Sequence, residues 1–157
     1  MEIGDLETVL SWRNHPKVRS YMFNQDVVGL VEHTEWFLRE SLNSKKHILI
    51  FEENFIPLGF LNITQSLVAK DGVWGLYAAP NAPLGTGSLL ASEGLTYAFK
   101  ILGLLKLTAE VIAFNDRSIR LHSKLGFRLE RTLGNQHFDG QKHHDVLCFA
   151  LMATEWK

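Results

Sequence analysis

The first half of the chain opens with apolar residues at helical spacing. They recur in this way within residues 5–15, and Pro16 disfavours helical geometry at the residue before it. A second helix is predicted from about Val31 to Asn43. The N-terminal part therefore consists of two helices joined by a short connection.

The pattern then changes to short runs of apolar, β-branched and aromatic residues, which are typical of strands. Such runs cover His47–Glu52 and Leu58–Thr64, and Glu53-Asn54 between them is a hairpin signal. Val73–Ala78 continues the series. We expect these segments to form a three-strand meander.

Helices and strands alternate after this meander. A long amphipathic helix follows a Gly-rich turn and ends at Gly103, and Lys106–Phe114 alternates like a strand. Asn115 can cap the next helix, which stops at Gly126.

Two last strands are predicted near Phe127–Leu133 and Asp145–Leu151, on either side of a turn at Asp139-Gly140. The order of all these elements predicts an α+β fold, or mixed α/β fold, built on a mixed sheet. With no repeat and no Pro/Ser-rich linker, residues 1–157 are expected to form one domain.

The charge balance excludes several classes of partner. Sixteen Lys plus Arg against 17 Asp plus Glu leave a formal net charge of -1, which disfavours capture of nucleic acids or acidic membranes. The single cysteine, Cys148, cannot form an internal disulfide, and residues 1–5 lack the regions of a signal peptide. These features indicate a cytoplasmic protein without a nucleic-acid or membrane partner.

The Gly-rich turn is the first candidate for chemistry. Leu84-Gly85-Thr86-Gly87-Ser88 stands at a helix start, where backbone N–H groups lack helical partners and the helix dipole adds positive potential. A pyrophosphate would be well bound there. The spacing matches neither the P-loop nor the dinucleotide fingerprint, and a Gly-x-Gly before a helix is by itself more often a tight turn.

The second candidate begins at the cap residue Asn115. Ser118 and His122 follow at positions that share one side of the helix. In isolation this pattern favours a surface helix with a solvated histidine.

Together the two motifs resemble those of the GNAT acetyltransferase superfamily. Leu84-Gly85-Thr86-Gly87 is similar to its acetyl-CoA pyrophosphate loop, and Asn115-x-x-Ser118-x-x-x-His122-x-Lys124-Leu125-Gly126-Phe127 is similar to its second cofactor motif. The resemblance runs from about residue 5 to the C-terminus and implies a GNAT-like acyl-CoA N-acyltransferase fold. Two residues depart from the pattern: Ala82 stands where Arg or Gln usually begins the loop, and His122 stands where the helix usually presents Tyr.

This resemblance implies acetyl-CoA as cosubstrate. The residues that it places at acetyl-CoA are Leu76, Tyr77, Ala78, Leu84, Gly85, Thr86, Gly87, Ser88, Asn115, Ser118 and Lys124.

The N-terminal half resembles a narrower group, the aminosugar N-acetyltransferases of the pseudaminic acid pathway. The resemblance rests on Trp12-Arg13-Asn14-His15-Pro16, Tyr21-Met22-Phe23, His33, Trp36, Gly75-Leu76-Tyr77 and Asp145-Val146. It implies acetylation of the 4-amino group of UDP-4-amino-4,6-dideoxy-N-acetyl-β-L-altrosamine. The residues that it places at this nucleotide-sugar substrate are Arg13, His15, Met22, Phe23, His33, Trp36 and Tyr77.

Chemical reasoning gives some of these residues a role. Arg13 could hold a phosphate through its fork of donors, while Met22, Phe23 and Trp36 could offer flat apolar area to uracil. Without the family match, the aromatic residues would be assigned to an ordinary core.

Two rival functions stay open. Related GNAT families acetylate ribosomal protein N-termini or polyamines and share a Trp-Arg-Asn-like start. From another class, the chain could be a catalytically silent acyl-CoA binding module.

The expected reaction is direct transfer of the acetyl group to the amine. A backbone N–H of Leu76, Tyr77 or Ala78 would polarise the thioester carbonyl, and Glu110 is the candidate base, acting through water. His122 would protonate the leaving thiolate in place of the usual Tyr. Cys148 gives no support for a covalent route.

Two further expectations concern the ends of the domain. His137, His143 and His144 are expected in a solvated or substrate-edge loop, Asn135–His144, with no metal site. Most relatives begin with a β-strand, for which residues 1–4 are too short, so the true start lies upstream or the edge strand is lost. An edge left open in this way would be managed by a covering loop or by a homodimer.

Overall fold

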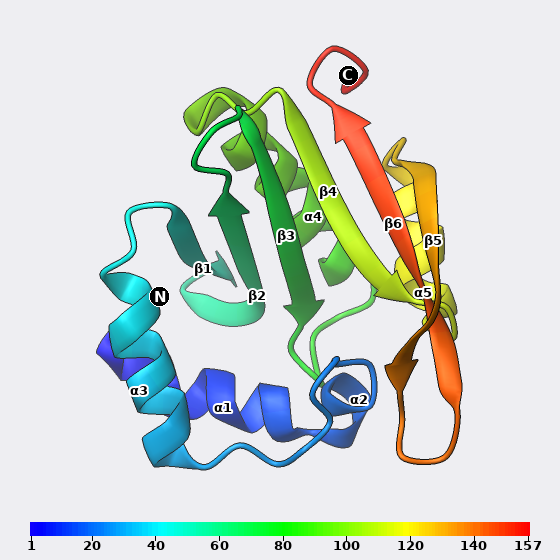
Figure 1. Cartoon of the computed structure of the whole chain (residues 1–157). Helices are drawn as coiled ribbons and strands as arrows, with labels where there is room; N and C mark the ends of the chain where they lie inside the picture. Colours follow the sequence, from blue (N-terminus) through cyan, green and yellow to red (C-terminus); the bar gives the residue numbers. More distant parts are fainter.

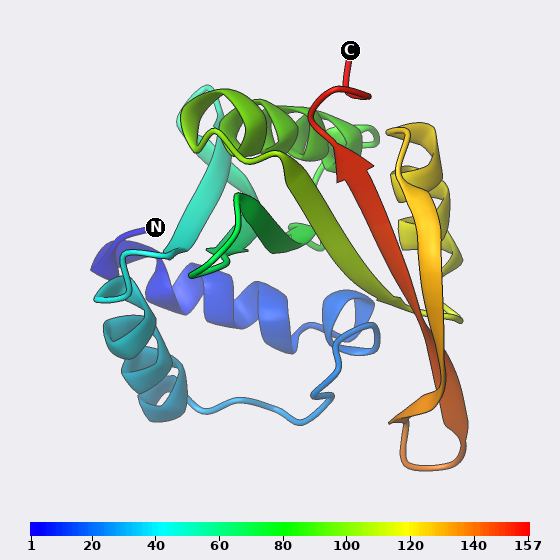
Figure 2. The same ribbon diagram turned by 45° about the horizontal axis from the view of Figure 1, so that its top comes forward.

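A six-stranded mixed sheet with helices on both faces organises the chain, in a computed structural model that describes residues 1–157 (Figures 1 and 2). The strands are β1 (Lys46–Glu53), β2 (Ile56–Gln65), β3 (Asp71–Ala78), β4 (Lys106–Ile112), β5 (Arg128–Phe138) and β6 (His143–Met152), in the order β1-β2-β3-β4-β6-β5. The helices are α1 (Leu6–Asn14), α2 (Pro16–Arg19), α3 (Leu30–Ser41), α4 (Thr86–Thr96) and α5 (Asp116–Lys124). The predicted α+β fold with a mixed sheet is confirmed.

The two predicted N-terminal helices are present, and Pro16 separates α1 from a further short helix. The ring of Pro16 occupies the first position of α2, where a missing N–H costs nothing. His15 caps this helix, because its Nδ1 accepts a hydrogen bond from the N–H of Lys17 at 3.2 Å. No strand precedes α1; a 3-10 turn at Ile3–Asp5 leads into it instead.

The predicted meander forms β1, β2 and β3. The turn between β1 and β2 places Asn54 and Phe55 at φ of 52° and 64°, a left-handed conformation that suits a tight hairpin. β1 is an edge strand, and the N-terminal ammonium of Met1 donates a hydrogen bond to the carbonyl of Ile48 at 3.1 Å.

The last hairpin is longer than expected. The predicted loop Asn135–His144 is mostly strand, since pairing continues to Phe138↔His143 and only the turn between them is left. Asp139 stabilises that turn, because its Oδ1 accepts the N–H groups of Gln141 and Lys142 at 2.8 and 2.9 Å. The expected loop is therefore wrong for this segment, although most of its residues are exposed to solvent as predicted.

β3 and β4 separate soon after they pair. Their parallel pairing covers only Asp71–Val73 with Lys106–Thr108, whereas β3 stays paired with β2 as far as Ala78. In Figure 1 the two strands diverge toward the helices α1 and α2. The edge of β3 that faces β4 is thus left without a strand partner over Trp74–Ala78.

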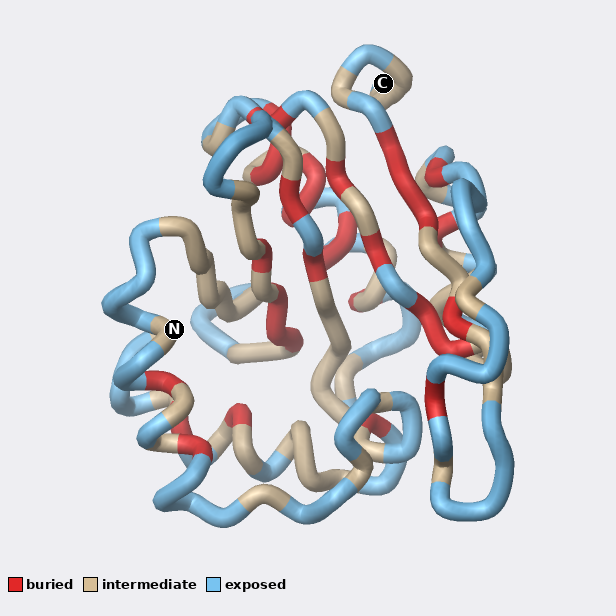
Figure 3. Tube along the Cα trace, viewed as in Figure 1, coloured by how far each residue is buried: buried red, intermediate tan, exposed pale blue.

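The core lies between the sheet and α4, and Figure 3 shows buried residues concentrated on the central strands and this helix. Gly94 lets α4 approach closely: a Cβ there would lie 2.9 Å from Leu61 Cδ2 and 3.1 Å from Trp74 Cζ3. The helices α1, α2 and α3 cover part of the opposite face (Figure 2). The remaining part of that face, beside the divergence of β3 and β4, stays accessible.

Candidate active site

Two adjoining hollows open where β3 and β4 diverge. The larger, the β3–β4 cleft, has a volume of about 310 Å³ and lies between the two strands, the segment after α2 and the start of α5. The smaller, the α5 channel, has a volume of about 170 Å³ and lies between the end of β3, α2, and the first turns of α4 and α5. Both hollows are lined by Tyr21, Met22, Leu76, Tyr77, Asn115 and Ser118. The two hollows therefore adjoin one another along these residues.

The start of α4 provides free backbone donors beside the α5 channel. Gly85 has a φ of 94°, and neither its N–H nor that of Gly87 has a hydrogen-bond acceptor within the chain. A Cβ at either glycine would meet no atom within 4 Å, so an anion has room to approach. Free amides, open space and the positive end of the helix dipole fit a pyrophosphate.

The start of α5 carries the second motif as predicted. The side chain of Asn115 accepts the N–H of Ser118 at 3.1 Å, which confirms the cap. Both residues line the two hollows. Lys124 is at the other end of α5, about 12 Å away along the helix at 1.5 Å per residue, and it is exposed and lines neither hollow.

Some of the other residues predicted at acetyl-CoA line the α5 channel, and others do not. Leu76, Tyr77, Ala78 and Gly87 line the α5 channel. Leu84 is fully exposed beside it, while Thr86 is buried at the helix start. Ser88 lies in the first turn of α4, half-buried, with its N–H bonded to the carbonyl of Gly85.

His122 lines the back of the β3–β4 cleft, but both of its ring nitrogens are already engaged. Nε2 accepts a hydrogen bond from the indole N–H of Trp74 at 3.1 Å, and Nδ1 donates one to the carbonyl of Ser118 at 2.8 Å. The side chain is only 3% exposed, and burial lowers the pKa of His122. The ring is therefore neutral at pH 7, and the geometry does not support its predicted role as proton donor to the thiolate.

Glu110, the predicted base, is at the β3–β4 cleft. It lies on β4, lines the β3–β4 cleft and is solvent-exposed. Cys148 is directly across from it on β6, outside that cleft. A water molecule between Glu110 and the cleft could carry a proton away from an amine.

Met22, Phe23 and Tyr77 line the β3–β4 cleft, as predicted for substrate contact. The ring of Tyr77 stacks on Phe60 with centroids 5.0 Å apart. Burial raises the pKa of Tyr77 far above its usual value, so its hydroxyl stays protonated. These residues give the cleft an aromatic wall.

Arg13 does not present its guanidinium to the cleft. Nη1 and Nη2 donate to the carbonyls of Asp26 and Asn24, the second at 2.7 Å. The side chain of Asn14 completes the clamp by donating to the carbonyl of Val28 at 2.8 Å and accepting its N–H at 2.9 Å. The predicted phosphate contact of Arg13 is replaced by a contact that orders the segment before α3.

The other predicted substrate residues form a layer behind the cleft. His33 is buried and stacks on Trp36 at 5.2 Å, and Trp36 packs in turn on Phe60, which lines the cleft. The pKa of His33 is lowered mainly by burial and secondly by the positive charge of Arg13. His15, the cap of α2, does not line the cleft either.

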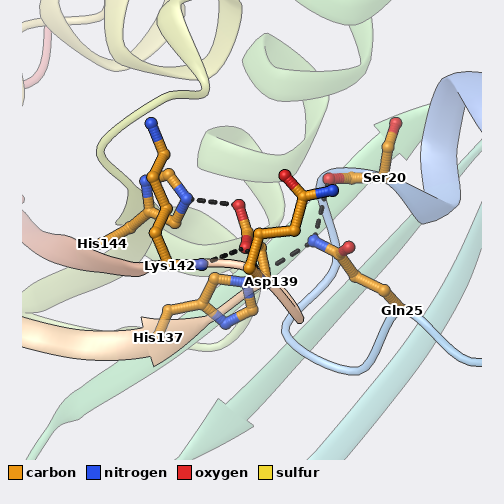
Figure 4. Close-up of polar contacts among 7 residues, drawn as sticks. Ser20, Gln25, His137, Asp139, Lys142 and His144 are labelled. Atoms are coloured by element: carbon orange, nitrogen blue, oxygen red, sulfur yellow. Dashed lines mark hydrogen bonds and ion pairs between the residues drawn. The ribbon is translucent and has the colours of Figure 1, made fainter.

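The tip of the β5–β6 hairpin packs against the segment that follows α2 (Figure 4). His144 Nε2 lies 2.6 Å from Asp139 Oδ2. The pKa of Asp139 is lowered well below its usual range, mainly by the hydrogen bond from the backbone N–H of Lys142 and secondly by the hydrogen bond from His144. His137 is buried, with Nε2 3.5 Å from Nε2 of Gln25, which donates to the carbonyl of Ser20.

This contact supports the cleft wall from behind. Phe23 meets the ring of His137 edge-on at 5.8 Å, and Tyr21 packs on Phe114 at 6.0 Å. His137 of the hairpin therefore acts as a packing partner of the segment that carries the cleft residues. The chain has no group of three or more His, Cys, Asp or Glu residues arranged to hold a metal ion.

Sequence reasoning missed several cleft residues. Asn62, Trp74 and Phe60 all line the β3–β4 cleft. The alternation along β2, which puts Phe60 and Asn62 on one face, was a signal for two of them.

Comparison with known proteins decides the family. Residues 1–128 match the family model described as an acetyltransferase (GNAT) domain. The chain belongs to the GNAT acetyltransferase family. As a GNAT enzyme it is an N-acetyltransferase that uses acetyl-CoA.

Individual relatives agree with this assignment. The GNAT enzyme is 31% identical over 128 residues to the acetyltransferase PseH of Campylobacter jejuni, across 80% of this chain and 78% of that protein. Its fold is similar to that of a spermidine N-acetyltransferase from Vibrio cholerae solved with CoA and spermine. That match has a TM-score of 0.92 at 20% identity and covers 99% of this chain and 94% of the other. An N-acetyltransferase from Staphylococcus aureus matches with a TM-score of 0.82 at 25% identity, over 98% and 95% of the two chains. None of the helices in the GNAT enzyme is long and apolar enough to cross a membrane.

Gly87→Asp tests the pyrophosphate loop. The carboxylate would stand where the anion approaches, so we expect acetyl-CoA affinity to fall by about tenfold or more. An acidic residue suits the first turn of a helix, so the fold should be retained. Gly87→Ala is the matched control, since its Cβ meets no atom within 4 Å. Equal affinities of the two variants in isothermal titration calorimetry would remove the loop from the binding site.

His122→Phe separates a structural role from an acid role. The variant leaves the buried indole N–H of Trp74 without its acceptor, which should cost about 1–3 kcal/mol of unfolding free energy. We expect kcat at saturating acetyl-CoA to stay within about tenfold of the wild type, whereas loss of a general acid would lower it by about 10²–10⁴.

The same variant should change the dependence of stability on pH. Because the pKa of His122 is lowered in the folded state, unfolded chains bind more protons below the ordinary histidine pKa of 6.5, and stability falls as pH decreases through that value. His122→Phe should reduce this loss in melting curves between about pH 5 and 7.5. The remaining slope reflects His33 and His47, whose pKa values are also lowered by burial. An unchanged slope would contradict the neutral assignment of His122.

Proposed function

We propose that the protein acetylates the 4-amino group of a UDP-linked 4-amino-4,6-dideoxy sugar, UDP-4-amino-4,6-dideoxy-N-acetyl-β-L-altrosamine, in pseudaminic acid biosynthesis. Residues 1–157 would act in the cytoplasm as one N-acetyltransferase domain. The similarity to PseH and the motifs of the N-terminal half support this substrate class.

The lining of the β3–β4 cleft is the observation that carries the proposal. Glu110 is its only carboxylate, and most of the wall is apolar or aromatic. A polyamine carries several positive charges and needs several carboxylates to hold them. A deoxy sugar with a methyl group instead needs apolar area and a few hydrogen-bonding groups. The cleft therefore favours the sugar, although the fold is shared with spermidine N-acetyltransferases.

The residues supply two functions for direct transfer. The free edge of β3 offers a backbone N–H of Leu76, Tyr77 or Ala78 to the thioester oxygen, where negative charge develops. Acetyl-CoA supplies the acetyl group. The amine lone pair forms the new C–N bond as the C–S bond breaks, and the amine proton passes through water to Glu110.

The departing sulfur needs a proton in return. Because both nitrogens of His122 are engaged, we assign this proton to water in the α5 channel and treat His122 as a positioning residue. The hydroxide that remains is neutralised when Glu110 releases the amine proton to solvent. The neutral ring fixes Trp74 behind the cleft and holds the first turn of α5 through Ser118.

A thiol-release assay with three classes of acceptor tests the substrate. The purified protein is given acetyl-CoA with a UDP-4-amino-4,6-dideoxy sugar, with spermidine or with a peptide that has a free N-terminus. We expect the sugar to be acetylated with a kcat/KM at least about 100-fold above the other two, because only the sugar matches the cleft. Mass spectrometry of the product identifies the acetylated position.

The other outcomes of this assay each contradict the proposal. Faster release with spermidine or peptide would assign the enzyme to one of those classes instead. Binding of acetyl-CoA without thiol release from any acceptor would indicate a silent binding module.

Glu110→Gln tests the base. The amide keeps the shape of the side chain and cannot take up a proton, so kcat should fall by about 10²–10⁴ while acetyl-CoA affinity stays unchanged. The loss should shrink at higher pH, where more of the amine is already unprotonated. An unaltered kcat in a pH series would exclude Glu110 from the reaction.

A further inference from the structure

We propose that Asn62 is a specificity-determining residue that recognises the hydroxyl group on the carbon next to the amine-bearing carbon of the acceptor. This inference rests on the proposed function and deepens it. Asn62 belongs to no sequence motif, and its place in the sheet is what distinguishes it.

Asn62 lies beside the one position of β3 in the cleft that has no side chain. It is the direct cross-strand partner of Gly75, and both residues line the β3–β4 cleft. A Cβ at Gly75 would lie 3.5 Å from Nδ2 and 3.6 Å from Oδ1 of Asn62. The carboxamide thus rests over Gly75 and, because that residue is glycine, no neighbouring side chain covers it from β3.

The carboxamide of Asn62 makes no hydrogen bond within the protein, and its atoms are open to the cleft although the residue is half-buried. The other two half-buried asparagines are paired: the side chain of Asn14 bonds to Val28, and that of Asn115 bonds to Ser118. An amide left unpaired in a largely apolar cleft is a group that a ligand can satisfy.

Local structure gives no other reason for asparagine at this position. Residue 62 is in the middle of β2, where it neither caps a helix nor forms a turn. Asparagine is disfavoured inside strands, because its side chain competes for backbone hydrogen bonds and packs poorly. A residue that weakens its own element in a cleft points to a role in binding.

The position of Glu110 indicates which acceptor group Asn62 meets. Val73 pairs with Thr108, so Gly75 and Glu110 stand at equivalent positions two residues further on, where the strands have separated. Asn62, Gly75 and Glu110 therefore form one row across β2, β3 and β4. If the acceptor amine lies between β3 and Glu110, Asn62 lies on the other side of Gly75. The distance from Gly75 to Asn62 is about one strand spacing, 4.8 Å. A group attached to the neighbouring carbon of the acceptor reaches that distance.

The chemistry of the carboxamide selects a hydroxyl. A carboxamide offers both donors and an acceptor, and a hydroxyl likewise donates and accepts, so the two can pair in either direction. The ammonium groups of a polyamine only donate, and a methyl group does neither. In the proposed sugar one neighbour of the amine-bearing carbon carries a hydroxyl and the other carries the methyl substituent. Asn62 would therefore determine that the hydroxyl-bearing carbon, and not the methyl-bearing carbon, lies toward β2.

The test pairs a protein change with a substrate change. Asn62→Leu keeps the size of the side chain and removes its hydrogen bonds. The acceptor is used with the adjacent hydroxyl and as the analogue that lacks it. We expect wild-type kcat/KM to be about tenfold higher with the hydroxyl, and Asn62→Leu to lose that advantage while it acetylates the deoxy analogue as the wild type does. The KM for acetyl-CoA should not change.

Two controls keep the result interpretable. Thr64→Val makes a similar polar-to-apolar change on the same face of β2 but outside the cleft. It should therefore leave kcat/KM unchanged with both acceptors. Asn62→Ala provides a second variant that adds no apolar bulk to the cleft, and it should lose the same preference for the hydroxyl.

Each contrary result has a distinct meaning. Equal losses with both acceptors, or a wild type that does not distinguish them, would overturn the role of Asn62 and leave the sugar acetyltransferase intact. A wild type that acetylates spermidine in place of the sugar would overturn the proposed function and this inference together.

Discussion

The early separation of β3 and β4 is the constraint on which the rest of the structure depends. The strands share only a short parallel ladder at Asp71–Val73, yet β3 continues its pairing with β2 to Ala78. One edge of β3 therefore keeps unpaired backbone groups inside the molecule, where such groups must find partners. The free amides of α4 and the cap of α5 lie beside this edge. An extended ligand with amides of its own can pair with the edge as an added strand would.

Features that depend on local backbone chemistry could be predicted from the sequence. Pro16 separates the first helices, Asn115 caps α5 and Gly126 follows its end, because each residue restricts or permits a backbone conformation by its own structure. Gly85 and Gly87 mark the loop before α4 for the same reason. The family resemblance joined these local signals into one fold and one cosubstrate.

Features that depend on distant partners could not be predicted. The donors of Arg13 suit a phosphate as well as they suit carbonyl groups, and only the folded chain shows that Asn24 and Asp26 take them. The same holds for His122, whose proton is committed to a backbone carbonyl of its own helix. In the last hairpin, the left-handed φ of 53° at Asn135 and an irregular register interrupt the alternation that would have revealed a strand.

The clamp of Arg13 and Asn14 on residues 24–28 has a thermodynamic consequence. Together with the hairpin tip, it fixes the segment that carries Met22 and Phe23 before any acceptor arrives. The conformational entropy of this segment is thus lost during folding and not during binding. An acceptor meets a wall whose shape is already set, so discrimination between amines rests on fit and leaves little room for adaptation by the protein.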